Sequence, residues 1–417
     1  MGQTFDLLNK IAFNRFGGSE NELKAAHIIK NEIEKAGGEC AIEPFSIPAF
    51  NMKKAKLIVT EPYYLEIEAM GVGRSGSTPE GGFEAEFIYA ENCDPIALRN
   101  AKGKIVLVNN TGYDAYSRLV MSCALGFITF SGEFCDLPEL TDIDRRMLRP
   151  RIIQNGRIPG VCIRCADAIK LVQSKAKKVR LEVLQDDYDA TSHNIVSVIK
   201  GTAFPDSEII VTAHYDSVFY GNGAWDNGTG AVSAIMLYRY LMKNKPTRTV
   251  RFLFCGSEEQ GVLGSRAYCE AHPEIVEKIL LCINYDMTGT TLGYNQTVLT
   301  GDSDLIEFAK ETARNIGYTT GWHEGIHSSD SVHFVYRGVP SIGIARSGKA
   351  KGHTRYDVIE PLSEAAINRS IEFGKALIDR VMVSEIFPIN KTMPKDLVNK
   401  ADGYINHGKP GIRIMIL

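Results

Sequence analysis

The amino-acid sequence predicts an α/β protein with a doubly wound, mixed but mostly parallel sheet, helices on both faces, and an inserted, mostly β domain. Three observations support this prediction. Helical patterns occupy the first 40 residues, strands and helices alternate after residue 193, and short β-rich runs separated by turn residues lie between them. Alternating strands and helices are typical of a parallel sheet that is covered on both faces.

The N-terminal residues are expected to form two helices. Apolar residues recur every three or four positions over residues 5–13 and 22–38. From about residue 41 the sequence consists of short runs rich in β-branched and aromatic residues, separated by Gly, Pro, Asn and Asp. We therefore predict an insertion over residues 57–187, and one discontinuous domain built from residues 1–56 and 188–417.

The C-terminal part is expected to supply most of the sheet. The expected strands cover residues 194–201, 208–213, 249–257, 280–285, 295–301 and 340–348. The expected helices cover residues 229–244, 262–279, 304–317 and 362–383. Residues 387–417 follow neither period, so we expect an irregular tail there.

Composition and charge exclude several classes of partner. Of the 417 residues, 44% are hydrophobic and 23% are charged. The number of Lys and Arg residues, 47, is close to the number of Asp and Glu residues, 50. This balance, without a long basic or acidic block, argues against a nucleic-acid partner or an anionic membrane surface. No apolar run approaches the roughly 20 residues of a membrane helix. We expect a soluble protein, and the sequence leaves its oligomeric state open.

The nine cysteines are odd in number and mostly embedded in apolar patterns. Cys162 and Cys165 form a CxxC pair, but a structural zinc needs four ligands and no second pair lies at zinc-finger spacing. Buried reduced thiols are the simpler interpretation, and they favour a cytoplasmic protein. No secretory leader is visible, and a secreted protein is the alternative if a leader has been removed.

Metal-ligating residue types stand where the predicted strands end, at the edge where open α/β sheets bind ligands. Five of these residues follow the ends of three predicted strands, one precedes a predicted helix, and one lies in the loop after the last strand. In chain order the seven residues are His214, Asp216, Asp226, Glu258, Glu259, Asp286 and His353. One imidazole or carboxylate at such a position is commonly a cap or a surface residue. Five such positions at one edge predict a metal centre.

The chemistry of paired zinc ions explains why these residue types are needed. Two zinc ions roughly 3.5–4 Å apart can share one carboxylate and hold both a scissile carbonyl and a water. Asp216 stands two residues beyond His214, where it can orient the imidazole. Glu258 and Glu259 are adjacent, so one can act as a general base and the other as a ligand.

The segments HYDS, WDNGTGA, GSEEQGVLGS, NYDMTG and GHT, in this order, resemble the co-catalytic dizinc exopeptidases related to aminopeptidase Y, bacterial leucyl aminopeptidase and glutamate carboxypeptidase II. The resemblance covers about residues 193–380 and the N-terminal helices. It implies two Zn²⁺ ions, or other divalent metals, and Glu258 as the general base. The implied ligands are His214, Asp226 and Asp286 for one ion, and Asp226, Glu259 and His353 for the other.

The resemblance implies an exopeptidase acting on peptides, with aminopeptidase action favoured over carboxypeptidase action. A glutaminyl cyclase shares the fold and the HYDS and EE motifs but uses one zinc, whereas the DNGTG helix start and the full ligand set favour two. A non-catalytic binding protein is disfavoured because no ligand is missing. A serine hydrolase needs a GxSxG elbow between strand and helix, and none occurs in that context.

The insertion resembles the protease-associated domain in the segments GKIVLVNNTG, MSCALGFITFS and IPGVCIRCADAIKLVQ. Such a module implies a role in access to the active site or in binding a partner. A passive structural insertion is an equally supported alternative, because insertions are the variable part of such scaffolds.

Residues 323–327 read HEGIH, which fits the HExxH zinc motif only within a helix. Glycines and the Ser-Ser-Asp cluster at 328–330 surround the motif, so we expect a loop that leads into a short helix. In the resembling family this loop carries a histidine where Ser331 stands, and in some members an oxyanion-stabilising tyrosine where Ile326 stands. His327, with His323 as an alternative, and Asp330 are the candidates for substrate or oxyanion contact.

Overall fold

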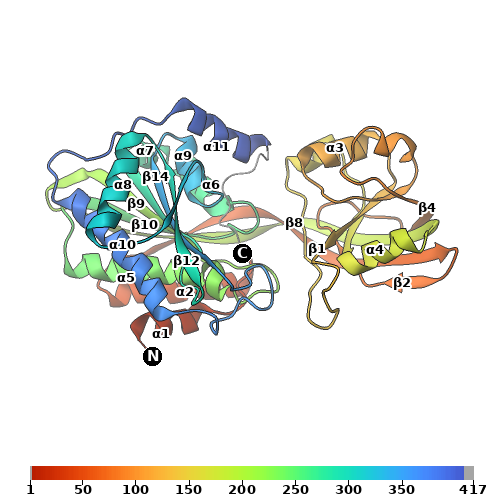
Figure 1. Cartoon of the computed structure of the whole chain (residues 1–417), viewed down its shortest axis with the longest axis horizontal. Coiled ribbons are helices and arrows are strands. Elements are labelled where there is room, and N and C mark those ends of the chain that lie inside the picture. The colour runs from red at the N-terminus through yellow and green to blue at the C-terminus, as the bar shows by residue number, and fades with distance from the viewer. Residues whose placement is uncertain (1, 408–417) are drawn as a thin grey trace. The chain divides into compact units, whose positions relative to one another are not determined.

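A computed structural model of the chain describes residues 2–407, which divide into two compact units (Figure 1). The first unit comprises Met1–Ile47 and Thr191–Leu417, and the second comprises Pro48–Ala190. The second unit begins before the predicted boundary at residue 57 and ends after the one at residue 187. The reason is that both boundaries fall within long strands, β1 (Ala41–Glu61) and β8 (Lys178–Ile199), which contribute residues to both units.

The sheet of the first unit has the strand order β13-β12-β14-β11-β9-β10-β8. Its further strands are β9 (Phe204–His214), β10 (Arg248–Cys255), β11 (Ile279–Tyr285), β12 (Gly293–Thr300), β13 (Gly321–Glu324) and β14 (Ser341–Gly348). Neighbouring strands pair in parallel, except that β12 runs antiparallel to β14 and β10 runs antiparallel to β8. The mixed, mostly parallel sheet predicted from the sequence is therefore confirmed.

Helices cover both faces of this sheet (Figure 1). One face packs against α1 (Gln3–Ile11), α2 (Glu20–Lys35), α5 (Gly230–Lys243), α8 (Ser303–Asn315) and α10 (Glu364–Met382). The other packs against α6 (Leu263–Ala271), α7 (Pro273–Val276) and α9 (Ser331–Tyr336). Alternation along β9 explains the two cores, because Val211 lies in the first apolar cluster and Ile210 lies in the second.

Two predictions for the first unit need correction. The helix expected over residues 262–279 is divided at His272, because Pro273 lacks an N–H and starts the separate helix α7. The tail expected to be irregular contains α11 (Lys395–His407), which packs against α9 through the buried Ala401. The rest of that tail, residues 408–417, lies outside the described residues.

The second unit is less purely β than the sequence predicts. Its further strands are β2 (Leu65–Ile67), β3 (Met70–Gly71), β4 (Phe83–Tyr89), β5 (Ile105–Leu107), β6 (Gly126–Ser131) and β7 (Gly160–Arg164). It also contains α3 (Tyr113–Met121) and α4 (Cys165–Gln173), with single 3₁₀ turns at Ala97–Asn100 and Ile152–Asn155. Strands β4, β5, β6 and β7 pair in parallel in that order, and parallel neighbours need crossover connections such as α3.

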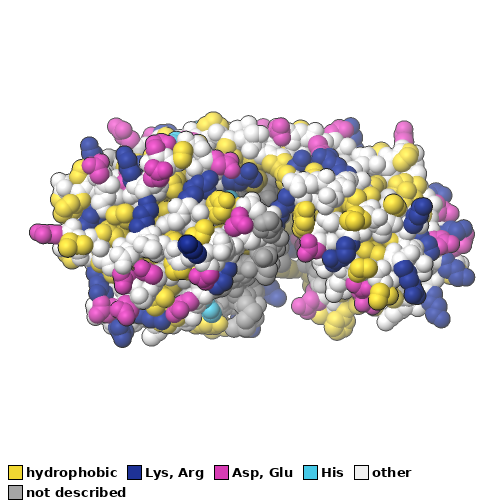
Figure 2. All heavy atoms as spheres, turned by 90° about the horizontal axis from the view of Figure 1, so that it is seen from above, with side chains coloured by type: hydrophobic (Ala, Val, Ile, Leu, Met, Phe, Trp, Pro, Cys, Tyr) yellow, Lys and Arg dark blue, Asp and Glu magenta, His cyan; other side chains and the backbone are white. Residues whose placement is uncertain are grey.

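The surface carries both signs of charge. Figure 2 shows Lys and Arg side chains interspersed with Asp and Glu over the face that it displays. Among residues 2–407, no helix combines the length and the hydrophobicity needed to cross a lipid bilayer.

Candidate metal centre

The carboxyl edge of the sheet positions most of the predicted metal ligands. His214 is the last residue of β9, and the parallel register aligns it with Cys255, the last residue of β10. Glu258 and Glu259 follow shortly after Cys255, and Asp286 comes directly after the end of β11. The carboxyl ends of parallel neighbours meet at one edge, so these side chains share a site. Asp226 reaches it from the turn Ala224–Thr229, before α5, and His353 reaches it from the loop after β14.

The five predicted ligands form two groups that share Asp226. One ligand atom from each of His214, Asp226 and Asp286 lies within 4.8 Å of the others, and the same holds for Asp226, Glu259 and His353. Asp226 Oδ1 lies 3.2 Å from His214 Nε2, whereas Asp226 Oδ2 lies 3.1 Å from His353 Nε2. One carboxylate thus presents an oxygen to each group, which is the arrangement that a bridge between two cations requires.

The donor set fits zinc. Asp286 Oδ1 and Glu259 Oε1 are buried and have no hydrogen-bond partner in the described part of the chain. Burial and the neighbouring charge of Asp226 raise the pKa of Glu259, so this carboxylate is unfavourable unless positive charge is added. Imidazole nitrogens and carboxylate oxygens are ligands that zinc prefers. The residues present therefore fit two zinc ions.

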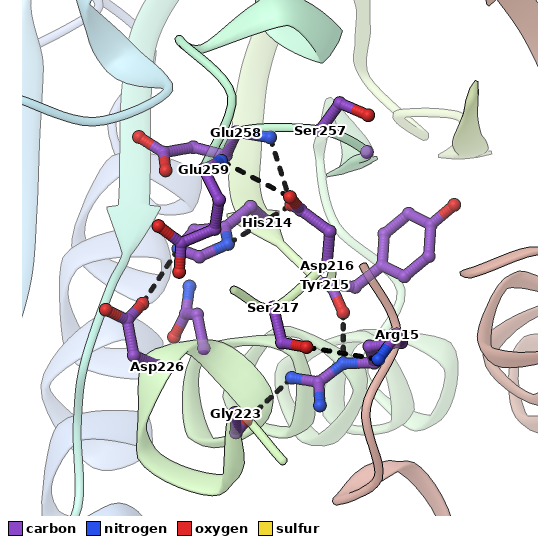
Figure 3. Close-up of polar contacts among 12 residues, drawn as sticks. Arg15, His214, Tyr215, Asp216, Ser217, Gly223, Asp226, Ser257, Glu258 and Glu259 are labelled. Carbon is purple, nitrogen blue, oxygen red and sulfur yellow. Dashed lines mark hydrogen bonds and ion pairs between the residues drawn. The ribbon is translucent and has the colours of Figure 1, made fainter. Parts of the chain in front are cut away.

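Asp216 holds the turn that carries both glutamates (Figure 3). Its Oδ1 accepts the backbone N–H of Glu258 at 3.0 Å, and its Oδ2 accepts that of Glu259 at 3.2 Å. Oδ1 also lies 3.4 Å from His214 Nδ1, where the sequence places the orienting partner of this imidazole. Ser257, before the glutamates, has a positive φ of 52°, a costly conformation that is commonly found at functional sites.

Glu258 stands beside the two ligand groups and belongs to neither of them within the described residues. Burial raises the pKa of its carboxyl well above the usual value, while the charge of His214 opposes this shift. A carboxylate that is not bound to a metal and has a raised pKa can accept and return a proton. The side chain of His353 is 60% exposed, so the site is open to solvent at that ligand.

The structure places His327 and Asp330 outside the two groups. His327 is buried, and its Nδ1 lies against Gly343 on β14, where an added Cβ would approach it to 2.7 Å. Burial lowers the pKa of His327, whereas the charge of Asp286 opposes this shift. Asp330 is buried at the start of α9, and burial raises the pKa of its carboxyl to about 6.

As expected from the sequence, residues 323–327 do not form a helical HExxH zinc motif. His323 and Glu324 belong to the strand β13, so the two histidines do not share a helical face. His323 Nε2 contacts Gln296 Oε1, and Glu324 pairs with Lys310 at 3.1 Å. The expected loop is shorter than predicted and covers residues 325–330, because the first half of the motif pairs with β12 as β13; the short helix α9 follows the loop.

Asp357 is a site residue that the sequence analysis missed. Its carboxylate is buried and accepts the backbone N–H groups of Trp225 at 2.6 Å and of Asp226 at 3.1 Å. Burial and the charge of Asp226 raise the pKa of Asp357 to about 7. The available signal was an acidic residue in the same loop as His353, but a sequence does not show which backbone groups such a residue contacts.

Replacing Asp357 with Ala is expected to destabilise the metal-free protein by roughly 2–4 kcal/mol, because two buried N–H groups lose their acceptor. Zinc affinity should fall by about 10–100-fold, since Asp226 is no longer held in place. Urea unfolding of the apo protein and a competitive zinc titration measure the two effects. Unchanged zinc affinity would contradict the role given to Asp357.

An α/β sheet that ends in two carboxylate–imidazole groups with a shared aspartate has the ligands that a pair of zinc ions requires. Residues 194–377 match the model of peptidase family M28.

Two named proteins align with most of this chain. Aminopeptidase YwaD of Bacillus subtilis (strain 168) is 27% identical over 417 aligned residues, which cover 95% of this chain and 87% of the relative. Carboxypeptidase Q of Mus musculus is 30% identical over 302 residues, or 67% of this chain. The aligned part of this chain spans only 62% of the length of that carboxypeptidase.

Two solved structures share the fold. BSAP, a zinc aminopeptidase from Bacillus subtilis, superimposes with a TM-score of 0.76 at 22% identity, covering 94% of this chain and 98% of BSAP. The aminopeptidase from Aneurinibacillus sp. strain AM-1 superimposes with a TM-score of 0.73 at 20% identity, covering 93% of this chain and 97% of that enzyme.

Proposed function

We propose that this protein is a zinc-dependent aminopeptidase that removes amino-terminal residues from peptides. The observation that carries the proposal is the pair of ligand groups joined by Asp226, with Glu258 unligated beside them. The similarity to aminopeptidase YwaD over 95% of the chain supports action at the amino terminus.

Each residue of the cluster then has a role. His214, Asp226 and Asp286 would hold one zinc, and Asp226, Glu259 and His353 would hold the other. The bound zinc ions supply the polarisation of the scissile carbonyl and the activation of water. Glu258 takes the proton of the attacking water and returns it to the leaving amine. Asp216 keeps Glu258 in position, because it accepts the backbone N–H of that residue.

His327 is the candidate for contact with the developing oxyanion. Its lowered pKa leaves the imidazole neutral at physiological pH, and a neutral imidazole can still donate one hydrogen bond. Asp330, three residues further along the chain, remains the second candidate for a substrate contact.

A panel of aminoacyl nitroanilides, each paired with its N-acetylated form, tests the proposed activity. We expect cleavage of the free-amine substrates and loss of cleavage on acetylation, because an aminopeptidase requires a free amino terminus. Dialysis against a chelator should abolish turnover, and added zinc should restore it. Equal cleavage of the acetylated substrates would exclude an aminopeptidase.

Carboxypeptidase action is the second candidate, because the carboxypeptidase Q relatives are similar over two thirds of this chain. Peptides with a free carboxyl terminus and an acetylated amino terminus distinguish the two activities. A glutaminyl cyclase of the same fold would contain one zinc, so two zinc ions per chain in the purified protein would argue against it. The proposed aminopeptidase requires both zinc binding and cleavage of free-amine substrates.

A further inference from the structure

Arg15 is a buried arginine whose hydrogen bonds run to the main chain. Arg15 lies in the segment that connects α1 and α2, and it is 0% exposed. Its guanidinium donates to the carbonyls of two residues in its own segment, Ile11 at 2.9 Å and Phe13 at 3.1 Å. It also donates to three carbonyls far along the chain, those of Tyr215, Asn222 and Gly223.

The three distant carbonyls belong to the loop that runs from His214 to Asp226. In Figure 3 the guanidinium lies beneath this loop, between Tyr215 and Gly223. The backbone N–H of Arg15 also donates to Ser217 Oγ at 3.1 Å. Arg15 thus holds the loop near its beginning, at Tyr215 and Ser217, and near its end, at Asn222 and Gly223.

The loop closes tightly around the guanidinium. Gly223 has a positive φ of 56°, and a Cβ added there would lie 2.6 Å from the carbonyl oxygen of Asp226 and 3.0 Å from Arg15 Nη2. The position of Asp226 is therefore tied closely to that of Arg15. The same loop carries Asp216, which accepts the backbone N–H groups of both glutamates.

Arg15 also places a fixed positive charge behind the cluster. Burial lowers the pKa of its guanidinium to about 10, against the opposing charges of Asp357, Asp216, Asp226 and Glu259. The group therefore stays protonated at neutral pH. A charged guanidinium offers up to five N–H donors in a fixed plane, whereas a lysine ammonium offers three donors on one atom.

We propose that Arg15 is a positioning residue for the metal centre. Its guanidinium holds the His214–Asp226 loop so that the two oxygens of Asp226 point toward His214 and His353. This inference rests on the proposed dizinc function. It predicts that the planar array of donors is needed, and that positive charge alone is insufficient.

The variant Arg15→Lys tests the proposal, because it keeps the charge and removes the planar array of donors. Zinc is titrated into the apo protein against a chromophoric chelator, which reports affinity without any activity assay. We expect binding of at least one zinc ion to weaken by about 10–100-fold, as for other residues that orient metal ligands. At saturating zinc, kcat should fall more than KM rises, because movement of the loop displaces Asp216, which holds the backbone of Glu258.

Arg248 supplies the matched control. It is 3% exposed and donates to the carbonyls of Ser384 at 2.7 Å and Glu385 at 2.8 Å. It starts β10, whereas Glu258 lies beyond the other end of that strand. Arg248→Lys should lower the melting temperature and leave zinc affinity unchanged.

Several outcomes would overturn the inference. Wild-type zinc affinity in Arg15→Lys would do so, and so would an equal loss of affinity in the Arg248→Lys control. If Arg15→Lys does not fold, Ser217→Ala removes one attachment of the same loop, and unchanged zinc affinity in that variant would reject the proposal. A wild-type protein that binds no zinc would instead reject the proposed function, so the two failures are distinguishable.

Discussion

Replacing Glu258 with Gln is expected to lower kcat for peptide hydrolysis by roughly 10²–10⁴-fold, the usual contribution of a positioned general base. The amide cannot take a proton from water, although its size and shape are almost those of the carboxylic acid. Zinc content should stay at the wild-type value, because Glu258 belongs to neither ligand group among the described residues. Turnover of an aminoacyl nitroanilide and elemental analysis of the same sample measure both quantities.

Glu259→Gln is the matched control for this experiment. The two glutamates are adjacent, and both donate their backbone N–H groups to the carboxylate of Asp216. Of the two, only Glu259 lies in a ligand group. The control should therefore lose zinc as well as activity. Near-normal hydrolysis by Glu258→Gln with its zinc retained would show that another group acts as the base.

The clustering of the candidate metal ligands could be predicted from sequence, because most of them follow a local pattern. A histidine or a carboxylate directly after a buried strand is visible in the sequence, and the sheet edge then brings such residues together. His214 and Asp286 are of this kind. His353 is harder to find, because it lies in a loop beyond β14, and its place in the order of motifs identified it.

The supporting residues could not be predicted, because they act through backbone groups that are distant in sequence. Arg15 contacts carbonyls about 200 positions away, and Asp357 contacts N–H groups more than 100 positions away. Nothing in the local sequence identifies such partners. The same limit applies to α11, whose buried Ala401 is explained only by its packing against α9.

Some predictions from the sequence remain untested by the fold. The segments that resemble a protease-associated domain lie in the second unit, and a role for that unit in access or partner binding stays a prediction. A cytoplasmic location also stays a prediction. Both differ in kind from the ligand predictions, because neither follows from the geometry of one site.

Replacing Asp226 with Asn is expected to remove both zinc ions and, with them, all measurable peptidase activity. Asp226 is the one residue common to the two ligand groups, and its two oxygens face different histidines. An asparagine offers one oxygen, and its amide nitrogen cannot bind a second cation. Equilibrium dialysis against buffered zinc should therefore show loss of both ions, whereas Asp286→Asn should lose chiefly the ion in its own group.

The metal-free Asp226→Asn protein separates loss of ligation from loss of structure. In the metal-free protein burial opposes the ionisation of Asp226, but His214 and His353 lower its pKa, so the carboxylate stabilises the fold and the apo variant should be less stable than the apo wild type. Zinc should raise the melting temperature of the wild type and leave that of the variant nearly unchanged, because a ligand stabilises only the state that binds it. Two zinc ions retained by Asp226→Asn, with a normal thermal shift, would show that Asp226 does not bridge the groups.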